Sequence, residues 1–135
     1  QPMAESIKIQ VGAACDQPEE LSMELRGRDS VSGLPRVVTV TTGEIVEALS
    51  DPLSAIAQVA KSVLSNTPPE LASDIIDRGI TLTGGGALLR GIEQFLTKET
   101  GVPVYRSENP LITVATGAGR TLQDHSIMRR VIENY

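Results

Sequence analysis

The second half of the chain alternates short apolar strands with amphipathic helices, which leaves few possible architectures. Residues 80–83 are apolar or β-branched and predict a buried strand, which three glycines at 84–86 bring to an end. Apolar residues at helical spacing predict a helix over 88–101, then a strand over 102–105 and a helix starting at 109–110. Two strands joined through a helix pair in parallel, so this half predicts an α/β unit with helices covering its strands.

The first half predicts a helix, a β-hairpin and two further helices. Helical spacing of apolar residues predicts the first helix over 4–14. Period-two alternation predicts a strand over 21–26, and β-branched residues predict its partner over 36–41, joined to it by a long loop with a flexible tip. Capping signals at 41–44 and at 51–52 predict two separate helices, of which the second is amphipathic.

A third capping signal, at 67–70, predicts a helix that stops at Gly79. Beyond it we expect the helix after 109–110 to turn apolar residues inward, and a short last helix over 127–132. The expected fold is therefore α/β, with a small α+β lobe over residues 1–66 and part of a larger α/β lobe over residues 67–135.

Composition excludes several classes of function. The net charge is −5 and aromatic residues are 2% of the chain, so neither phosphate neutralisation nor base stacking favours nucleic acid as a partner. No apolar run approaches the roughly 20 residues of a membrane helix. The single cysteine, Cys15, precludes an intrachain disulfide, and we expect it and the single histidine, His125, to have no catalytic role.

The glycine triplet is the sharpest local motif. Gly84, Gly85 and Gly86 follow a predicted strand and precede a predicted helix, at the strand end where α/β proteins bind ligands. Three missing β-carbons let a flat or charged ligand approach the backbone, and N–H groups at a helix start favour phosphate. A tight turn without any ligand is the alternative, because the triplet matches neither a dinucleotide fingerprint nor a Walker loop.

The triplet in its setting resembles the MreB family of bacterial actin-like proteins. The resemblance rests on Glu70–Gly91, which contains the triplet, on Glu99–Val104 and on Pro110–Leu111 with Val114–Gly119, and further matches lie at Ala4–Lys8 and Gly33–Arg36. It covers nearly the whole chain but only the last part, under half, of a typical member. It implies an actin-like ATPase fold, in which the chain supplies subdomain IIB and the C-terminal part of the ribonuclease H-like subdomain IIA.

The resemblance also implies a nucleotide site for ATP or ADP with Mg²⁺. The triplet would line the cleft beside the phosphates and ribose of the nucleotide, and Leu88 and Leu89 would lie near its adenosine. The charged pair Glu5 and Lys8 would face the adenosine from the other lobe. The pair is spaced i, i+3 and so shares one helix face, although a solvated surface pair is the alternative reading. The implied binding residues are Glu5, Lys8, Gly84, Gly85, Gly86, Leu88 and Leu89.

At the level of the cell, the resemblance implies a cytoplasmic, membrane-associated filament protein that determines cell shape, with itself, the membrane and the cell-wall machinery as partners. The sequence lacks the glycine-rich phosphate loops of the family, so we expect no catalytic or metal-binding residue, no hydrolysis and weak or undetectable nucleotide binding by this chain alone. Two alternatives stay open: a piece of another actin-fold ATPase or a sugar kinase, and a stand-alone interaction module that binds no nucleotide.

Overall fold

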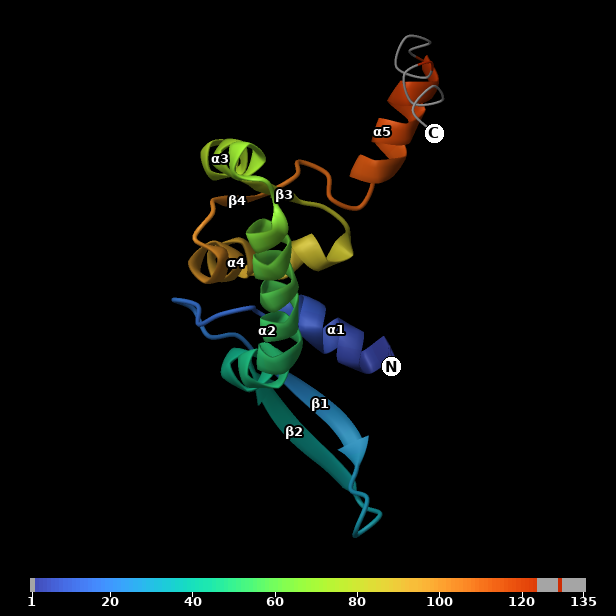
Figure 1. Cartoon of the computed structure of the whole chain (residues 1–135). Coiled ribbons are helices and arrows are strands. Elements are labelled where there is room, and N and C mark those ends of the chain that lie inside the picture. The colour runs from blue at the N-terminus through green and yellow to red at the C-terminus, as the bar shows by residue number, and fades with distance from the viewer. Residues whose placement is uncertain (1, 124–128, 130–135) are drawn as a thin grey trace.

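The computed structural model describes residues 2–123 and 129 and shows an elongated molecule (Figure 1). Helix α1 (Pro2–Val11) is followed by the hairpin of strands β1 (Ser22–Arg28) and β2 (Pro35–Thr41). The hairpin projects from one end of the molecule, and helices α3 (Pro69–Arg78) and α5 (Thr113–Gln123) lie toward the other end (Figure 1). Among the described residues, no helix combines the length and the apolar character needed to cross a membrane.

The hairpin confirms the predicted strand pair. Its strands are antiparallel, with Leu25 opposite Val38, and the side chains of Met23 and Leu25 are half-buried between exposed neighbours. Hydrogen bonds close the tip of the hairpin, while its expected flexibility stays a prediction. The Asp29 carboxylate accepts from the backbone N–H groups of Val31 and Ser32, at 2.9 and 2.8 Å.

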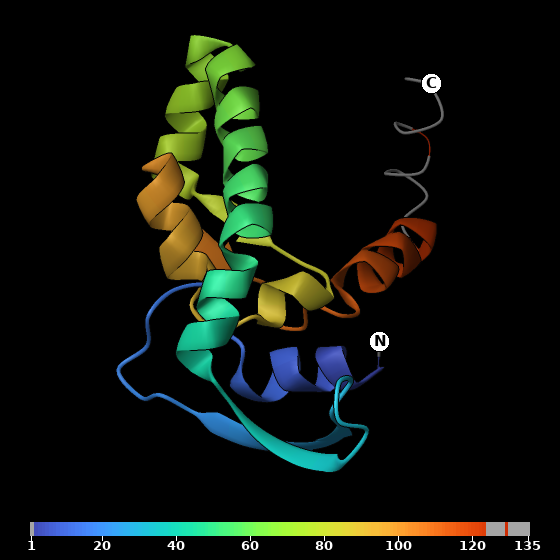
Figure 2. The ribbon, with the colours of Figure 1, turned by 90° about the horizontal axis from the view of Figure 1, so that it is seen from below.

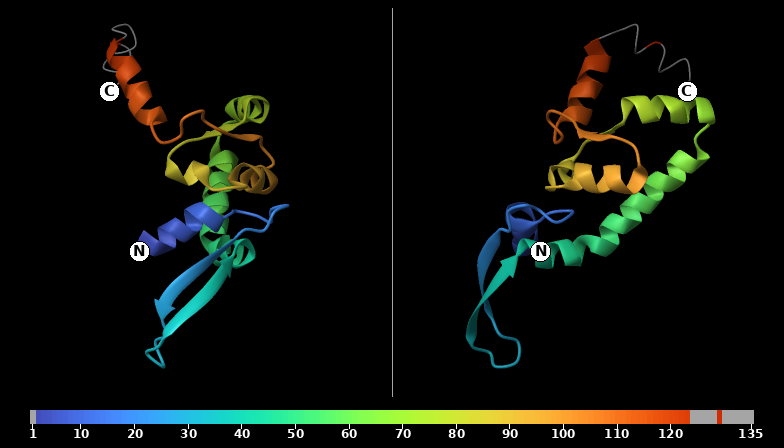
Figure 3. Two further views of the ribbon diagram at one scale, coloured as in Figure 1. Left: turned by 180° about the vertical axis from the view of Figure 1, so that it is seen from behind. Right: turned by 90° about the vertical axis from the view of Figure 1, so that its left-hand side faces the viewer.

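Helix α2 (Thr42–Asn66) is one continuous helix where the sequence predicts two. It begins at the predicted capping box, in which the Thr41 hydroxyl accepts from the Glu44 backbone and the Glu44 carboxylate accepts from the Thr41 backbone. Pro52 lies inside the helix and does not start a new one. A proline removes one helical hydrogen bond and favours a bend, and α2 changes direction along its length in the right-hand view of Figure 3.

The second half contains the predicted parallel pair of strands. Helix α3 (Pro69–Arg78) leads into β3 (Ile80–Leu82), and helix α4 (Ile92–Thr100) leads into β4 (Val104–Arg106). β3 and β4 pair in parallel, with Thr81 opposite Tyr105. Gly79, which joins α3 to β3, has a φ of 79°, and a β-carbon there would meet the Pro103 carbonyl oxygen at 2.6 Å.

Helix α5 (Thr113–Gln123) departs from expectation. Its apolar residues were expected to face inward, but Val114 and Leu122 are 72% and 67% exposed. Figure 1 shows the reason, since α5 extends away from the strands and helices that form the core. The last predicted helix, over 127–132, and His125 lie outside the described residues.

The hydrophobic core joins the two predicted lobes. Leu53 and Ala57 of α2 pack in one cluster with Leu96 of α4 and Val104 of β4, and Figure 2 shows α2 running beside α4. Ala14, which follows α1, belongs to the same cluster. This core holds α1 and α2 against the β-α-β unit, while the lobe boundary at 66/67 stays a prediction.

Candidate functional site

The glycine triplet forms an open bend after β3. Gly84 has a φ of 83°, and its N–H donates to the Pro110 carbonyl oxygen at 2.8 Å. The next four residues form a short 3-10 helix, η1 (Gly85–Leu88), whose start no side chain caps. A β-carbon on Gly84 or Gly86 would meet no atom within 4 Å. The bend is therefore accessible and not sealed beneath packed side chains.

The helix expected directly after the triplet begins later. Leu88 ends η1 and Leu89 is extended, so α4 starts only at Ile92, after Gly91 in a left-handed conformation. The triplet thus opens a single tight turn, and it does not sit at the N-terminus of a long helix with a full dipole. Leu88 remains exposed, whereas Leu89 packs against the core cluster.

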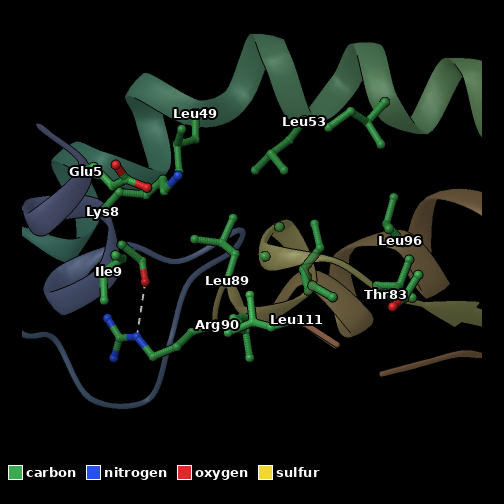
Figure 4. Close-up of a pocket in the computed structure, with 18 residues that line it drawn as sticks. Glu5, Lys8, Ile9, Leu49, Leu53, Thr83, Leu89, Arg90, Leu96 and Leu111 are labelled. Atoms are coloured by element: carbon green, nitrogen blue, oxygen red, sulfur yellow. Dashed lines mark hydrogen bonds between the residues drawn. The ribbon is translucent and has the colours of Figure 1, made fainter. Parts of the chain in front are cut away.

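Glu5 and Lys8 lie on α1, across from this bend. Both side chains are exposed, and the helix brings them to the same face as expected from their spacing. In Figure 4, Glu5 and Lys8 lie together with Ile9 at one end of a pocket, and Thr83 and Leu96 lie at its other end. The first and second halves of the chain therefore contribute different parts of its wall.

This pocket has a volume of about 700 Å³, within the range of small-molecule sites. Six of the seven predicted binding residues line it, and Gly84 is the exception. The six lining residues that the sequence predicts are Glu5, Lys8, Gly85, Gly86, Leu88 and Leu89. The structure therefore brings together residues some 80 positions apart, while their role in binding stays a prediction.

Sequence reasoning missed the wall that α2 provides. Leu49, Leu53 and Ile56 of α2 line the pocket, together with Leu111 from the loop before α5. The amphipathic pattern of α2 was a visible signal, but amphipathicity alone does not distinguish a stripe that faces the core from one that lines a pocket. A smaller hollow of about 490 Å³ adjoins it, lined by Glu5, Lys8 and Leu49 among others.

Sequence reasoning also missed Arg90, which lines the pocket and follows the two leucines. Its Nε donates to the Gly12 carbonyl oxygen at 3.1 Å, and its Nη2 donates to the Val11 carbonyl oxygen at 2.9 Å and to the Thr42 hydroxyl at 3.3 Å. Arg90 thereby joins the turn, the end of α1 and the start of α2.

In the described part of the chain, two carboxyl groups have a perturbed pKa, and both lie away from the pocket. Backbone N–H groups of Ser32 and Val31, with the Arg36 side chain, lower the pKa of Asp29 at the hairpin tip. The Lys61 ammonium lowers the pKa of Glu99 on α4. Within residues 2–123, no group of three or more His, Cys, Asp or Glu side chains is placed to hold a metal ion.

Comparison with known proteins gives one consistent result. The family described as MreB/Mbl protein matches residues 1–130. The cell shape-determining protein Mbl of Bacillus cereus is 52% identical over 121 residues, and MreB of Escherichia coli is 48% identical over 120 residues. These alignments cover 90% and 89% of this chain but only 36% and 35% of the relatives, so the chain spans little more than a third of their length.

Solved structures agree with the sequence relatives. MreB5 of Spiroplasma citri bound to ADP has a TM-score of 0.87 and 35% identity to this chain. The match covers 99% of this chain and 40% of that one. The same protein bound to AMPPNP has a TM-score of 0.86, also at 35% identity. The arrangement of helices and strands described above is thus that of the corresponding part of an actin-like protein.

Proposed function

Since the chain belongs to the MreB/Mbl family of cell shape-determining, actin-like proteins, we propose that it forms one wall of a nucleotide site in a filament subunit. The family membership favours this function over the sugar kinases and other actin-fold ATPases that the sequence alone left open. The proposed ligand is ATP or ADP, because the similar MreB5 structures are bound to ADP and AMPPNP.

The observation that carries the proposal is the shared pocket of α1, α2 and the glycine turn. Its apolar lining from Leu49, Leu88 and Leu89 suits the flat face of a purine ring. The bare backbone of Gly85 and Gly86 leaves room for ribose or phosphate to approach closely.

Glu5 and Lys8 add polar groups to the far side of the same pocket. A carboxylate accepts hydrogen bonds and an ammonium donates them, so the pair can select the amino and ring-nitrogen edge of adenine or the ribose hydroxyls. Both side chains are free to adjust because they are exposed. We therefore assign them to the nucleoside, and the glycine turn to the sugar and phosphate side.

The described residues fit the nucleoside better than the metal. Mg²⁺ prefers carboxylate, water and phosphate oxygens in octahedral geometry, and no carboxylate cluster lies at this pocket within the described part of the chain. We accordingly assign no metal ligand and no catalytic residue here. In the proposed function, Mg²⁺ binds through the nucleotide phosphates and neutralises their charge.

Nucleotide binding would be coupled to self-association. In actin-like proteins assembly is head-to-tail, and a heterologous contact of this kind propagates as an open filament. We propose that this chain contributes part of that contact surface, in a cytoplasmic filament that associates with the membrane and the cell-wall machinery. These partners follow from the family, and nucleic acid is not among them.

The test is an amide chemical-shift titration of this chain with AMPPNP and Mg²⁺ up to millimolar concentration, which detects weak binding. We expect the largest shifts at Glu5, Lys8, Gly85 and Gly86, and none at the hairpin tip around Val31. Shifts at the tip but not at the pocket would overturn the proposal. An unchanged spectrum at millimolar AMPPNP would do so too, because the proposal requires weak but detectable binding by this wall alone, and would favour an interaction module without nucleotide.

A further inference from the structure

Arg90 ties together the two walls of the pocket. We infer that it is the positioning residue that holds α1 against the glycine turn, and so sets where Glu5 and Lys8 stand relative to Gly85 and Gly86. This inference rests on the proposed nucleotide site, and adds to it a residue that controls the spacing across the site.

The side chain of Arg90 reaches three acceptors at once. Two are the carbonyl oxygens of Val11 and Gly12, at 2.9 and 3.1 Å, and the third is the Thr42 hydroxyl at 3.3 Å. Figure 4 shows the Arg90 side chain extending from the turn toward α1, with a dashed line marking one of these bonds. Thr42 in turn accepts from the Leu21 N–H, so the network also includes the entry to α2.

The backbone of Arg90 binds the same segment. Arg90 forms a parallel bridge with Ala13, and its carbonyl oxygen accepts from the Ala14 N–H at 2.7 Å. Val11, Ala13 and Ala14 are all buried, with 4% exposure or less. The end of α1 is therefore held by both the main chain and the side chain of a single residue.

The chemistry of this contact is specific to arginine. The last carbonyl groups of a helix lack intrahelical partners and carry partial negative charge, so a cation there is favourable. Several N–H donors in a rigid fork can serve separate acceptors, and an ammonium on a flexible stem cannot match that geometry. Burial of Val11, Gly12 and Thr42 limits competition from water.

The geometry gives Arg90 its influence on the pocket. Leu88 and Leu89 precede it directly and line the pocket, while Lys8 lies about one helical turn before its acceptors on α1. A shift of α1 relative to the turn would move Glu5 and Lys8 away from the ligand but leave Gly85 and Gly86 in place. Loss of Arg90 should therefore separate the two halves of the site and leave each half folded.

The first measurement is hydrogen exchange of backbone amides in this chain, compared for Arg90→Met, Arg90→Lys and the control Arg26→Met. Arg26 is an exposed arginine of β1 that does not line the pocket. We expect Arg90→Met to speed exchange in α1 by about tenfold or more, as befits loss of several hydrogen bonds, with α4 unchanged. The exchange rate of α1 in Arg90→Lys should lie between those of Arg90→Met and the unsubstituted chain, and the rate in Arg26→Met should match that of the unsubstituted chain. Unchanged exchange in α1 for both Arg90 variants would overturn the inference.

The second measurement separates positioning from mere stabilisation. In the AMPPNP titration, Arg90→Met should reduce the chemical-shift changes at Glu5 and Lys8 several-fold and leave those at Gly85 and Gly86 unchanged. If all four shifts persist at their original ratio, Arg90 is only a structural tie and the inference fails. Should Arg90→Met not fold, Arg90→Lys carries the same comparison. A failure of the proposed function is seen separately, as an absence of pocket shifts in the unsubstituted chain.

Discussion

Lys61 of α2 and Glu99 of α4 form an ion pair, with Nζ 2.7 Å from Oε2. The two residues lie one helical turn beyond Ala57 and Leu96, which belong to the buried core cluster. The pair therefore extends the contact between α2 and α4 from the apolar core to the solvent. The pair lies in the half of α2 that follows Pro52, beyond the bend that the proline favours.

The ion pair predicts a pH dependence. The Lys61 side chain lowers the pKa of Glu99 in the folded protein below its ordinary value of 4.5. The stabilisation is thus complete above that value and is lost as the pH falls through the lower folded pKa. We expect Glu99→Gln to lower the urea midpoint slightly at pH 7 and by less at pH about 3, and added salt to shrink the difference at pH 7. An equal loss at both pH values would show that the charge is not responsible.

The core contact between α2 and α4 predicts a larger effect. Leu53 is 5% exposed and packs in the cluster with Ile92 and Leu96, whereas Val59 on the same helix is 65% exposed. We expect Leu53→Ala to reduce the free energy of unfolding by about 2–4 kcal/mol through the cavity that it leaves. Val59→Ala should change it by less than about 0.5 kcal/mol. Urea unfolding followed by circular dichroism measures both, and similar values for the two would contradict the packing described here.

Gly12 predicts a steric effect at the end of α1. A β-carbon on Gly12 would overlap the carbonyl oxygen of Lys8, a backbone atom that cannot move aside without distorting α1. We expect Gly12→Ala to cost about 1–3 kcal/mol of stability. Gly27→Ala is the control, because a β-carbon there meets nothing within 4 Å and β1 is an extended strand. Thermal unfolding of Gly12→Ala and Gly27→Ala measures the two effects, and an unchanged midpoint for Gly12→Ala would refute the clash.

The elements that sequence predicts correctly are those with strong local signals. The alternation in β1, the β-α-β order from Ile80 and the capping box at Thr41 each describe a single local structure. The capping signal at Asp51–Pro52 led to the wrong prediction of a second helix, because the same two residues are also compatible with a helix interior. Pro52 and Ala48 are exposed, so water can satisfy the carbonyl group that the proline leaves without a partner.

Part of the candidate site could be predicted and part could not. The glycine turn and the Glu5–Lys8 pair are sequence features, and the fold places them at one pocket. The role of Arg90 could not be predicted from the sequence, because two of its acceptors are the backbone carbonyl groups of Val11 and Gly12, and every residue type has such a group. The apolar stripe of α2 was visible, but only the fold shows that part of it faces a pocket.

Gly86 allows binding to be tested without disturbing the fold. Gly86 lines the pocket, has no positive φ, and offers open space for a β-carbon, so Gly86→Ala should unfold at an unchanged urea midpoint. The added methyl group would occupy space that the proposed ligand needs, and we expect it to weaken AMPPNP binding about tenfold, equivalent to about 1.4 kcal/mol.

The matched control for Gly86→Ala is Gly117→Ala on α5, where a β-carbon also meets nothing within 4 Å and which lies outside the pocket lining. It should bind AMPPNP as the unsubstituted chain does. Gly84→Ala serves as a second comparison, because its φ of 83° predicts a loss of stability of about 1 kcal/mol or more in addition to any effect on binding. Equal AMPPNP shifts at Glu5 and Gly85 in Gly86→Ala and in the unsubstituted chain would show that the nucleotide does not occupy the space beside Gly86.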